Sequence, residues 1–73
     1  MKVTLESTTK KVFLNNVECR VWEGKTESGI PVHAYIPRIA VDEKADLTQF
    51  EKELKEQREP SPEIAAIPMR LIL

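Results

Sequence analysis

The sequence predicts a small α+β fold, with a three-stranded antiparallel meander, a C-terminal strand beside it and one amphipathic helix packed on the sheet. Alternating β-rich runs between residues 12 and 41, separated by two turn sequences, predict the meander. A capped apolar stripe within residues 46–59 predicts the helix. The apolar run Met69–Leu73 predicts the last strand, because so apolar an end is expected to be buried in a sheet.

The 73 residues suffice for a single small domain. We expect the sheet within residues 2–41, the helix within about 46–59 and a C-terminal segment at 60–73. So short a chain buries a small core, and its single cysteine cannot form an intrachain disulfide. Self-association as a homodimer is therefore expected to supply part of the stability.

The first strand begins near the N-terminus. Val3 and Leu5 alternate with polar residues, as in a half-buried strand. The polar sequence 6–9 is compatible with a loop, a bulge or the exposed middle of one long strand that continues through residues 12–14.

The dipeptide Asn15-Asn16 predicts the first hairpin turn. Asparagine tolerates the positive φ angles that a two-residue type I′ turn requires. This turn sets Leu14 opposite Val17 and Val12 opposite Cys19, so that these apolar residues share one face.

A four-residue loop between Gly24 and Gly29 is the second predicted turn. It pairs Val21 with Val32, so that apolar residues meet along the second and third strands. The predicted core face is then formed by Val12, Leu14, Val17, Cys19, Val21, Ile30, Val32, Ala34 and Ile36. Pro31 and Pro37 indicate that the third strand is an edge, since proline cannot donate a ladder hydrogen bond.

Asp46 has the form of a helix N-cap, with Gln49 at the third helical position. Leu47, Phe50 and Leu54 follow at i, i+3 and i+7 and are expected to pack on the core face. The prolines at 60 and 62 end the helix. Beyond them, we expect Met69–Leu73 to pair with the outer edge of the first strand, in its own subunit or in a neighbour.

The charge is nearly balanced overall and uneven along the chain. A formal net charge of -1 gives no global field that steers the chain to nucleic acid or to an anionic membrane. Residues 1–41 carry six basic against four acidic side chains, whereas residues 42–73 carry five against eight. The sheet region is therefore mildly basic and the helical region acidic.

No N-terminal apolar segment resembles a secretory signal, and no apolar run has the length of a membrane span. With one free cysteine, this pattern favours a cytoplasmic protein that has no membrane contact. One cysteine and one histidine cannot supply the roughly four ligands of a structural zinc site. No metal and no cofactor are expected.

The predicted register places several chemically distinctive side chains on the sheet face opposite the core. Arg20 lies opposite His33 and Glu18 lies opposite Tyr35 in that register. The candidate binding face consists of Phe13, Arg20, Trp22, His33 and Tyr35. Aromatic and guanidinium groups together are typical of interface hot spots and of base-stacking platforms. The plainer interpretation is that these residues cover the second side of the sheet.

The sequence favours a non-enzymatic protein-interaction or assembly module over two other hypotheses. The alternative is a nucleic-acid-binding accessory protein that uses the same face together with Lys10 and Lys11. A small enzyme would need His33 as a base beside Tyr35 and Glu18, which is a weak pattern. Cys19, on the core face, is expected to be an inert core residue. No catalytic residue is therefore predicted.

Overall fold

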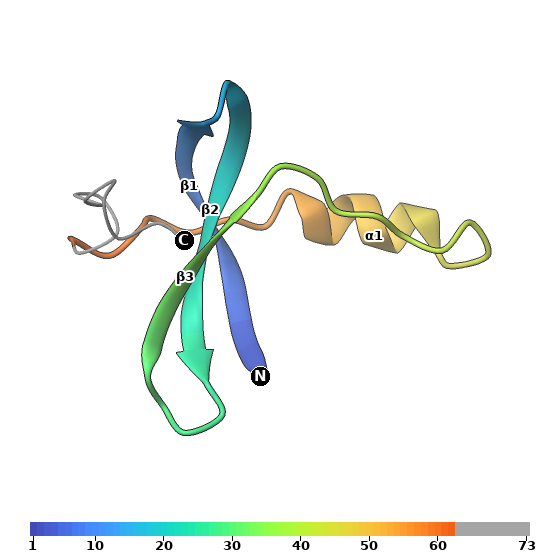
Figure 1. The fold of residues 1–73 in the computed structure, drawn as a ribbon. Helices are drawn as coiled ribbons and strands as arrows, with labels where there is room; N and C mark the ends of the chain where they lie inside the picture. Colours follow the sequence, from blue (N-terminus) through green and yellow to red (C-terminus); the bar gives the residue numbers. More distant parts are fainter. Residues whose placement is uncertain (63–73) are drawn as a thin grey trace.

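The computed structural model describes residues 1–62. It contains an antiparallel sheet in the order β1-β2-β3 and one helix. The elements are β1 (Val3–Leu14), β2 (Val17–Thr26), β3 (Pro31–Ile36) and α1 (Leu47–Leu54). The three-stranded antiparallel meander and the α+β class are confirmed (Figure 1). The predicted C-terminal strand, Met69–Leu73, lies outside the described residues.

The first hairpin forms as predicted. Asn15 and Asn16 adopt φ angles of 51° and 66°, the left-handed values of a type I′ turn. Val12 lies opposite Cys19 and Leu14 opposite Val17. The turn and the apolar pattern therefore set this register together.

The polar sequence near the middle of β1 is a bulge within one long strand. Ser7 pairs with Trp22 and Lys11 pairs with Arg20, so residues 8–10 lie opposite Val21 alone. Thr8 is fully buried there, and its hydroxyl donates to the Val21 carbonyl at 2.6 Å. The same hydroxyl accepts from the Lys10 amide at 3.3 Å. Thr8 thereby replaces hydrogen bonds that the interrupted ladder loses.

We expect Thr8→Val to lower the free energy of unfolding by about 1 kcal/mol, because it removes a buried hydroxyl while keeping the side-chain shape. Thr9→Val is the matched control. It makes the same substitution at an exposed neighbour, and its expected loss is smaller. Urea unfolding of both variants measures the difference. Equal losses at the two positions would show that the Thr8 hydroxyl does not support the bulge.

The second hairpin differs from its prediction. Thr26 pairs with Ile30 through an amide-to-carbonyl hydrogen bond of 2.9 Å, and the Gly29 amide donates to the Thr26 carbonyl at 3.0 Å. The loop is therefore the three residues 27–29, and Gly29 takes the left-handed φ of 90° that closes such a loop. Gly24 lies inside β2 and not at the turn.

This shorter loop reverses the facing of β3. Val21 pairs with Tyr35 and Trp22 pairs with Ala34, so the predicted Val21–Val32 pair is wrong. The register moves by an odd number of residues, which turns every β3 side chain to the other side of the sheet. Val32, Ala34 and Ile36 therefore leave the predicted core face. We call the two sides the Val21 face and the Trp22 face.

Pairing and alternation assign the residues of each face. The Val21 face includes Val12, Leu14, Val17, Cys19, Val21, Glu23, His33 and Tyr35. The Trp22 face includes Val3, Leu5, Ser7, Lys11, Phe13, Glu18, Arg20, Trp22, Val32, Ala34 and Ile36.

Burial is concentrated on the Val21 face of β2. Cys19, Val21 and Glu23 are buried, whereas Arg20 and Trp22 between them are partly exposed. Among residues 1–62, the buried apolar side chains are Cys19 and Val21. The core of the described part is therefore small.

The helix begins as predicted and ends earlier. The Asp46 carboxylate accepts from the Gln49 amide at 3.0 Å, which confirms the N-cap. The helix ends at Leu54, before the predicted limit of about 59, and none of its residues is buried. It extends away from the strands (Figure 1), and the predicted packing of its stripe on the sheet is not seen. No helix of residues 1–62 is long and apolar enough to cross a membrane.

Candidate interaction surface

The predicted binding residues lie on two faces. Arg20 and Trp22 pair with Ile36 and Ala34 on the Trp22 face. Phe13 shares that face, since it lies opposite Glu18, two residues before Arg20. His33 and Tyr35 lie on the Val21 face, opposite Glu23 and Val21. The prediction that all five share one surface is wrong, because it depended on the four-residue loop.

His33 and Tyr35 form a contact of their own. Their ring centroids lie 5.5 Å apart with the rings at 86°, an edge-to-face arrangement. Burial raises the pKa of Tyr35, and its hydroxyl oxygen is buried with no hydrogen-bond partner in the described part of the chain.

The carboxylate that the enzyme hypothesis required is elsewhere. Glu18 is on the Trp22 face, where it pairs with Lys11 at 3.4 Å. The carboxylate that lies opposite His33 across the strands is Glu23, and both of its oxygens accept hydrogen bonds from residues 58 and 61. The arrangement therefore does not assemble the His33, Tyr35 and Glu18 trio.

The Trp22 face presents apolar and basic side chains together. Phe13 is 66% exposed and Val3 is 43% exposed at its β1 side. A hollow lies between this face, the segment after β3 and the end of α1. Its lining consists of Ser7, Arg20, Trp22, Ile36, Pro37, Arg38, Ile39, Leu54 and Gln57. Apolar side chains together with two arginines, Arg20 and Arg38, have the composition of a protein interface.

Trp22 is at the centre of this surface. It lines the hollow just described and also a second hollow toward β1 and α1, which includes Leu5, Glu53 and Arg58. Since aromatic side chains supply large contact areas at low entropic cost, Trp22 is the side chain best placed to anchor a partner.

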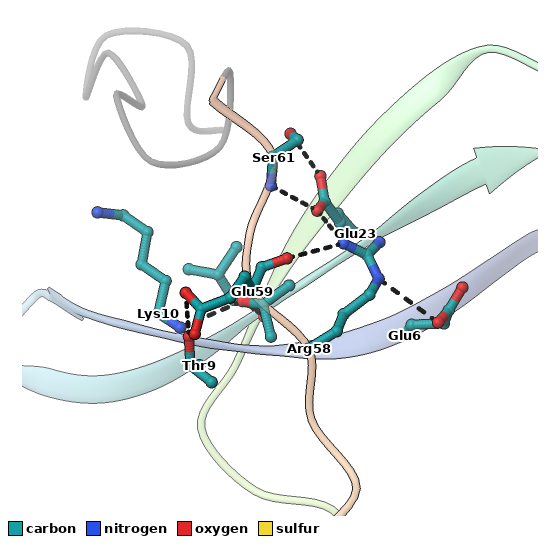
Figure 2. A network of polar contacts seen from close by, with 9 residues as sticks. Glu6, Thr9, Lys10, Glu23, Arg58, Glu59 and Ser61 are labelled. Atoms are coloured by element: carbon teal, nitrogen blue, oxygen red, sulfur yellow. Dashed lines mark hydrogen bonds and ion pairs between the residues drawn. The ribbon is translucent and has the colours of Figure 1, made fainter.

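A polar network fixes the chain that follows α1. Arg58 donates to the buried Glu23 carboxylate, and the Arg58 Nε lies 3.4 Å from Glu6 (Figure 2). The Ser61 amide and hydroxyl donate to Glu23 at 2.9 and 2.8 Å. Glu6 and Glu23 are opposite each other in the β1–β2 ladder, so the guanidinium lies between two like charges. We call Glu6, Glu23, Arg58 and Ser61 the Arg58 clamp.

The backbone reinforces the Arg58 clamp at the β1 bulge. The Arg58 amide donates to the Ser7 carbonyl at 3.2 Å, and the Thr9 amide donates to the Arg58 carbonyl at 2.9 Å. The Ser7 hydroxyl also donates to the Glu56 carbonyl at 2.8 Å. Residues 56–58 are therefore attached to the outer edge of β1, the edge at which the sequence predicts docking of the later run Met69–Leu73.

The clamp shifts the ionisation of Glu23. Burial alone would raise its pKa, but the hydrogen bonds from Arg58 and Ser61 and the charge of Arg58 outweigh it. The pKa of Glu23 is consequently below its ordinary value, and the carboxylate is ionised at neutral pH.

Sequence reasoning missed the Arg58 clamp. The sequence places Arg58 at the solvated end of a longer helix and Glu23 at an ordinary strand position. The partners are separated by 35 and 38 residues in the chain, and no local pattern links them. Within residues 1–62, no group of His, Cys, Asp and Glu side chains is arranged to hold a metal ion.

Comparison of the chain with protein-family models, with curated proteins and with solved structures gave no match.

Proposed function

We propose that this chain is a non-enzymatic protein-interaction or assembly module that self-associates through its Trp22 face. The observation that carries the proposal is the partly exposed Trp22 at the centre of an apolar surface. The same surface contains Arg20 and Arg38, and Arg and Trp are enriched among the residues that dominate binding energy.

The small core supports self-association. The described part buries the side chains of Cys19 and Val21, while large apolar groups such as Phe13 stay open to solvent. Burial of apolar area has to offset about 1–2 kcal/mol of backbone entropy for every ordered residue. A second copy on the Trp22 face would add the missing area.

Further parts of the proposal concern the chain end and the compartment. We propose that Met69–Leu73 adds a strand at the outer edge of β1, in the same subunit or in a neighbour. The buried thiol of Cys19 suits a reducing compartment, and we place the module in the cytoplasm.

Trp22→Ala is expected to raise the dissociation constant of the self-associated form at least tenfold, because it removes the central apolar anchor. Val17→Ala is the matched control. It removes a half-exposed apolar side chain from the Val21 face, and its expected change is below about threefold. Size-exclusion chromatography with light scattering, over a range of protein concentrations, measures both.

Two outcomes would contradict the proposal. One is a monomer at high micromolar concentration. The other is salt-sensitive binding of DNA or RNA oligonucleotides that Trp22→Ala abolishes, which would favour the nucleic-acid alternative. Arg20, Arg38 and Lys11, which share or border the Trp22 face, are the cations that such binding would use.

A further inference from the structure

We propose that α1 of a second copy covers the Trp22 face and that the exchange is reciprocal, each helix packing on the sheet of the other subunit. This inference rests on the proposed self-association and names its contact. It joins two apolar surfaces of one chain that stay partly exposed among residues 1–62, the stripe of α1 and the Trp22 face.

The helix is amphipathic, yet two of the three residues of its stripe are exposed and the third, Phe50, is only partly buried. Leu47 and Leu54 are 47% and 45% exposed, and no residue of α1 is buried. An isolated helix this short is unstable in water, since most helical stability in proteins comes from packing of the apolar face. We therefore expect the stripe of α1 to pack against an apolar surface in the stable form of the protein.

The charges around the stripe match those of the Trp22 face. At 3.6 residues per turn, Glu51 and Glu53 flank the stripe on its two sides, and Lys52 lies on the opposite side of the helix. Arg20 and Arg38 line the hollow beside Trp22, and the Arg20 guanidinium also donates to the Thr8 carbonyl at 3.2 Å. An apolar stripe bordered by carboxylates thus complements an apolar face bordered by arginines.

The dimensions also agree. Eight helical residues rise about 12 Å, and neighbouring strands lie about 4.8 Å apart. A helix the length of α1 therefore crosses the width of a three-stranded sheet.

The Arg58 clamp explains why only the Leu54 end of α1 borders its own sheet while the rest of the helix does not cover it. The helix ends at Leu54, and within four residues the chain is attached to β1 through the Arg58 backbone and side chain. From that attachment α1 extends away from the strands (Figure 1), so its Leu47 end is presented outward. The Arg58 clamp thereby keeps the stripe of α1 accessible to another molecule.

Leu47→Asp tests the exchange in the full-length chain. It places a charge in the stripe, and we expect it to raise the dimer dissociation constant at least tenfold. Thr48→Asp is the matched control, because it puts the same charge on the adjacent residue outside the stripe. An acidic side chain in the first turn favours the helix at either position, so the helix is retained. Thr48→Asp is expected to change the dimer dissociation constant less than threefold.

A mixing experiment tests whether the helix of one chain packs on the sheet of another. Trp22→Ala chains have an impaired sheet face and an intact helix, while Leu47→Asp chains have the converse. Their mixture is expected to form a heterodimer with one intact contact, at concentrations where each variant alone is monomeric. Light scattering and native mass spectrometry of the mixture measure it.

The outcomes separate the two proposals. If Trp22→Ala weakens self-association and Leu47→Asp does not, the proposed packing of α1 on the other subunit is wrong. Self-association through the Trp22 face is then still supported. If wild-type protein is monomeric, the proposed function itself fails. Circular dichroism confirms that each variant folds. Emission of Trp22, the single tryptophan of the chain, should shift to shorter wavelength as wild-type concentration rises, and a constant emission would overturn the exchange.

Discussion

Gly24→Ala is expected to lower the free energy of unfolding by about 3 kcal/mol or more, the upper end of the cost of overpacking. A Cβ atom at position 24 would lie 1.7 Å from the Thr4 carbonyl oxygen and 2.9 Å from the Leu5 Cα. Both neighbours are backbone atoms of β1, so no side-chain rotation relieves the clash. The strands would have to separate where Leu5 pairs with Gly24.

Gly29→Ala is the control for this prediction. A Cβ atom at position 29 would meet no atom of the described residues within 4 Å, and the strain there comes from a φ of 90° alone. The expected cost is therefore smaller, about 1 kcal/mol. Chemical unfolding followed by circular dichroism compares the two variants. A Gly24→Ala variant as stable as Gly29→Ala would show that β1 and β2 do not approach so closely.

The two glycines also show why one hairpin could be predicted from the sequence and the other could not. At Asn15-Asn16, turn chemistry and apolar alternation favour the same register, and the register is confirmed. In the second hairpin the sequence pattern puts Gly24 and Gly29 at the two ends of the loop. In the structure Gly24 lies inside β2, where the backbone of β1 leaves no room for a side chain. Close approach between strands depends on tertiary structure, so the local sequence does not reveal it.

The pattern of β3 could not correct this error. Its alternation has apolar residues on one side, but His33 and Tyr35 on the other side are amphipathic and are accommodated on the Val21 face. Both registers are therefore compatible with the composition of the strand. The sequence Thr26–Gly29, with glycine as the last loop residue, was the available signal for the three-residue loop.

The candidate surface was predicted in part. Phe13, Arg20 and Trp22 do share a face, because alternation along β1 and β2 follows from the first hairpin. Arg38, Ile39 and Leu54 join that surface from outside the sheet, through the path of the chain after β3 and the Arg58 clamp. These contributions depend on long-range contacts, for which one sequence offers no periodic signal.

The Arg58 clamp leads to the second large effect. Glu23→Gln is expected to lower the free energy of unfolding at pH 7 by about 2 kcal/mol, because it replaces charge-assisted hydrogen bonds with neutral ones in a buried position. Glu18→Gln is the control. It alters the exposed Lys11–Glu18 pair, and exposed ion pairs contribute about 0–1 kcal/mol. Equal losses in the two variants would contradict the role of the clamp.

The stabilising effect of Glu23 is expected to depend on pH and to be lost in acid. Because the pKa of Glu23 is lowered in the folded protein, the folded state binds its proton less tightly than the unfolded chain does. Its stabilising contribution is full above the ordinary value of 4.5 and is lost as pH falls through the lower folded-state pKa. The difference in unfolding free energy between wild type and Glu23→Gln should therefore shrink on acidification below that value. Urea unfolding at a series of pH values measures it, and a difference that stays constant or grows in acid would show that the ionised carboxylate does not hold Arg58 and Ser61 to the sheet.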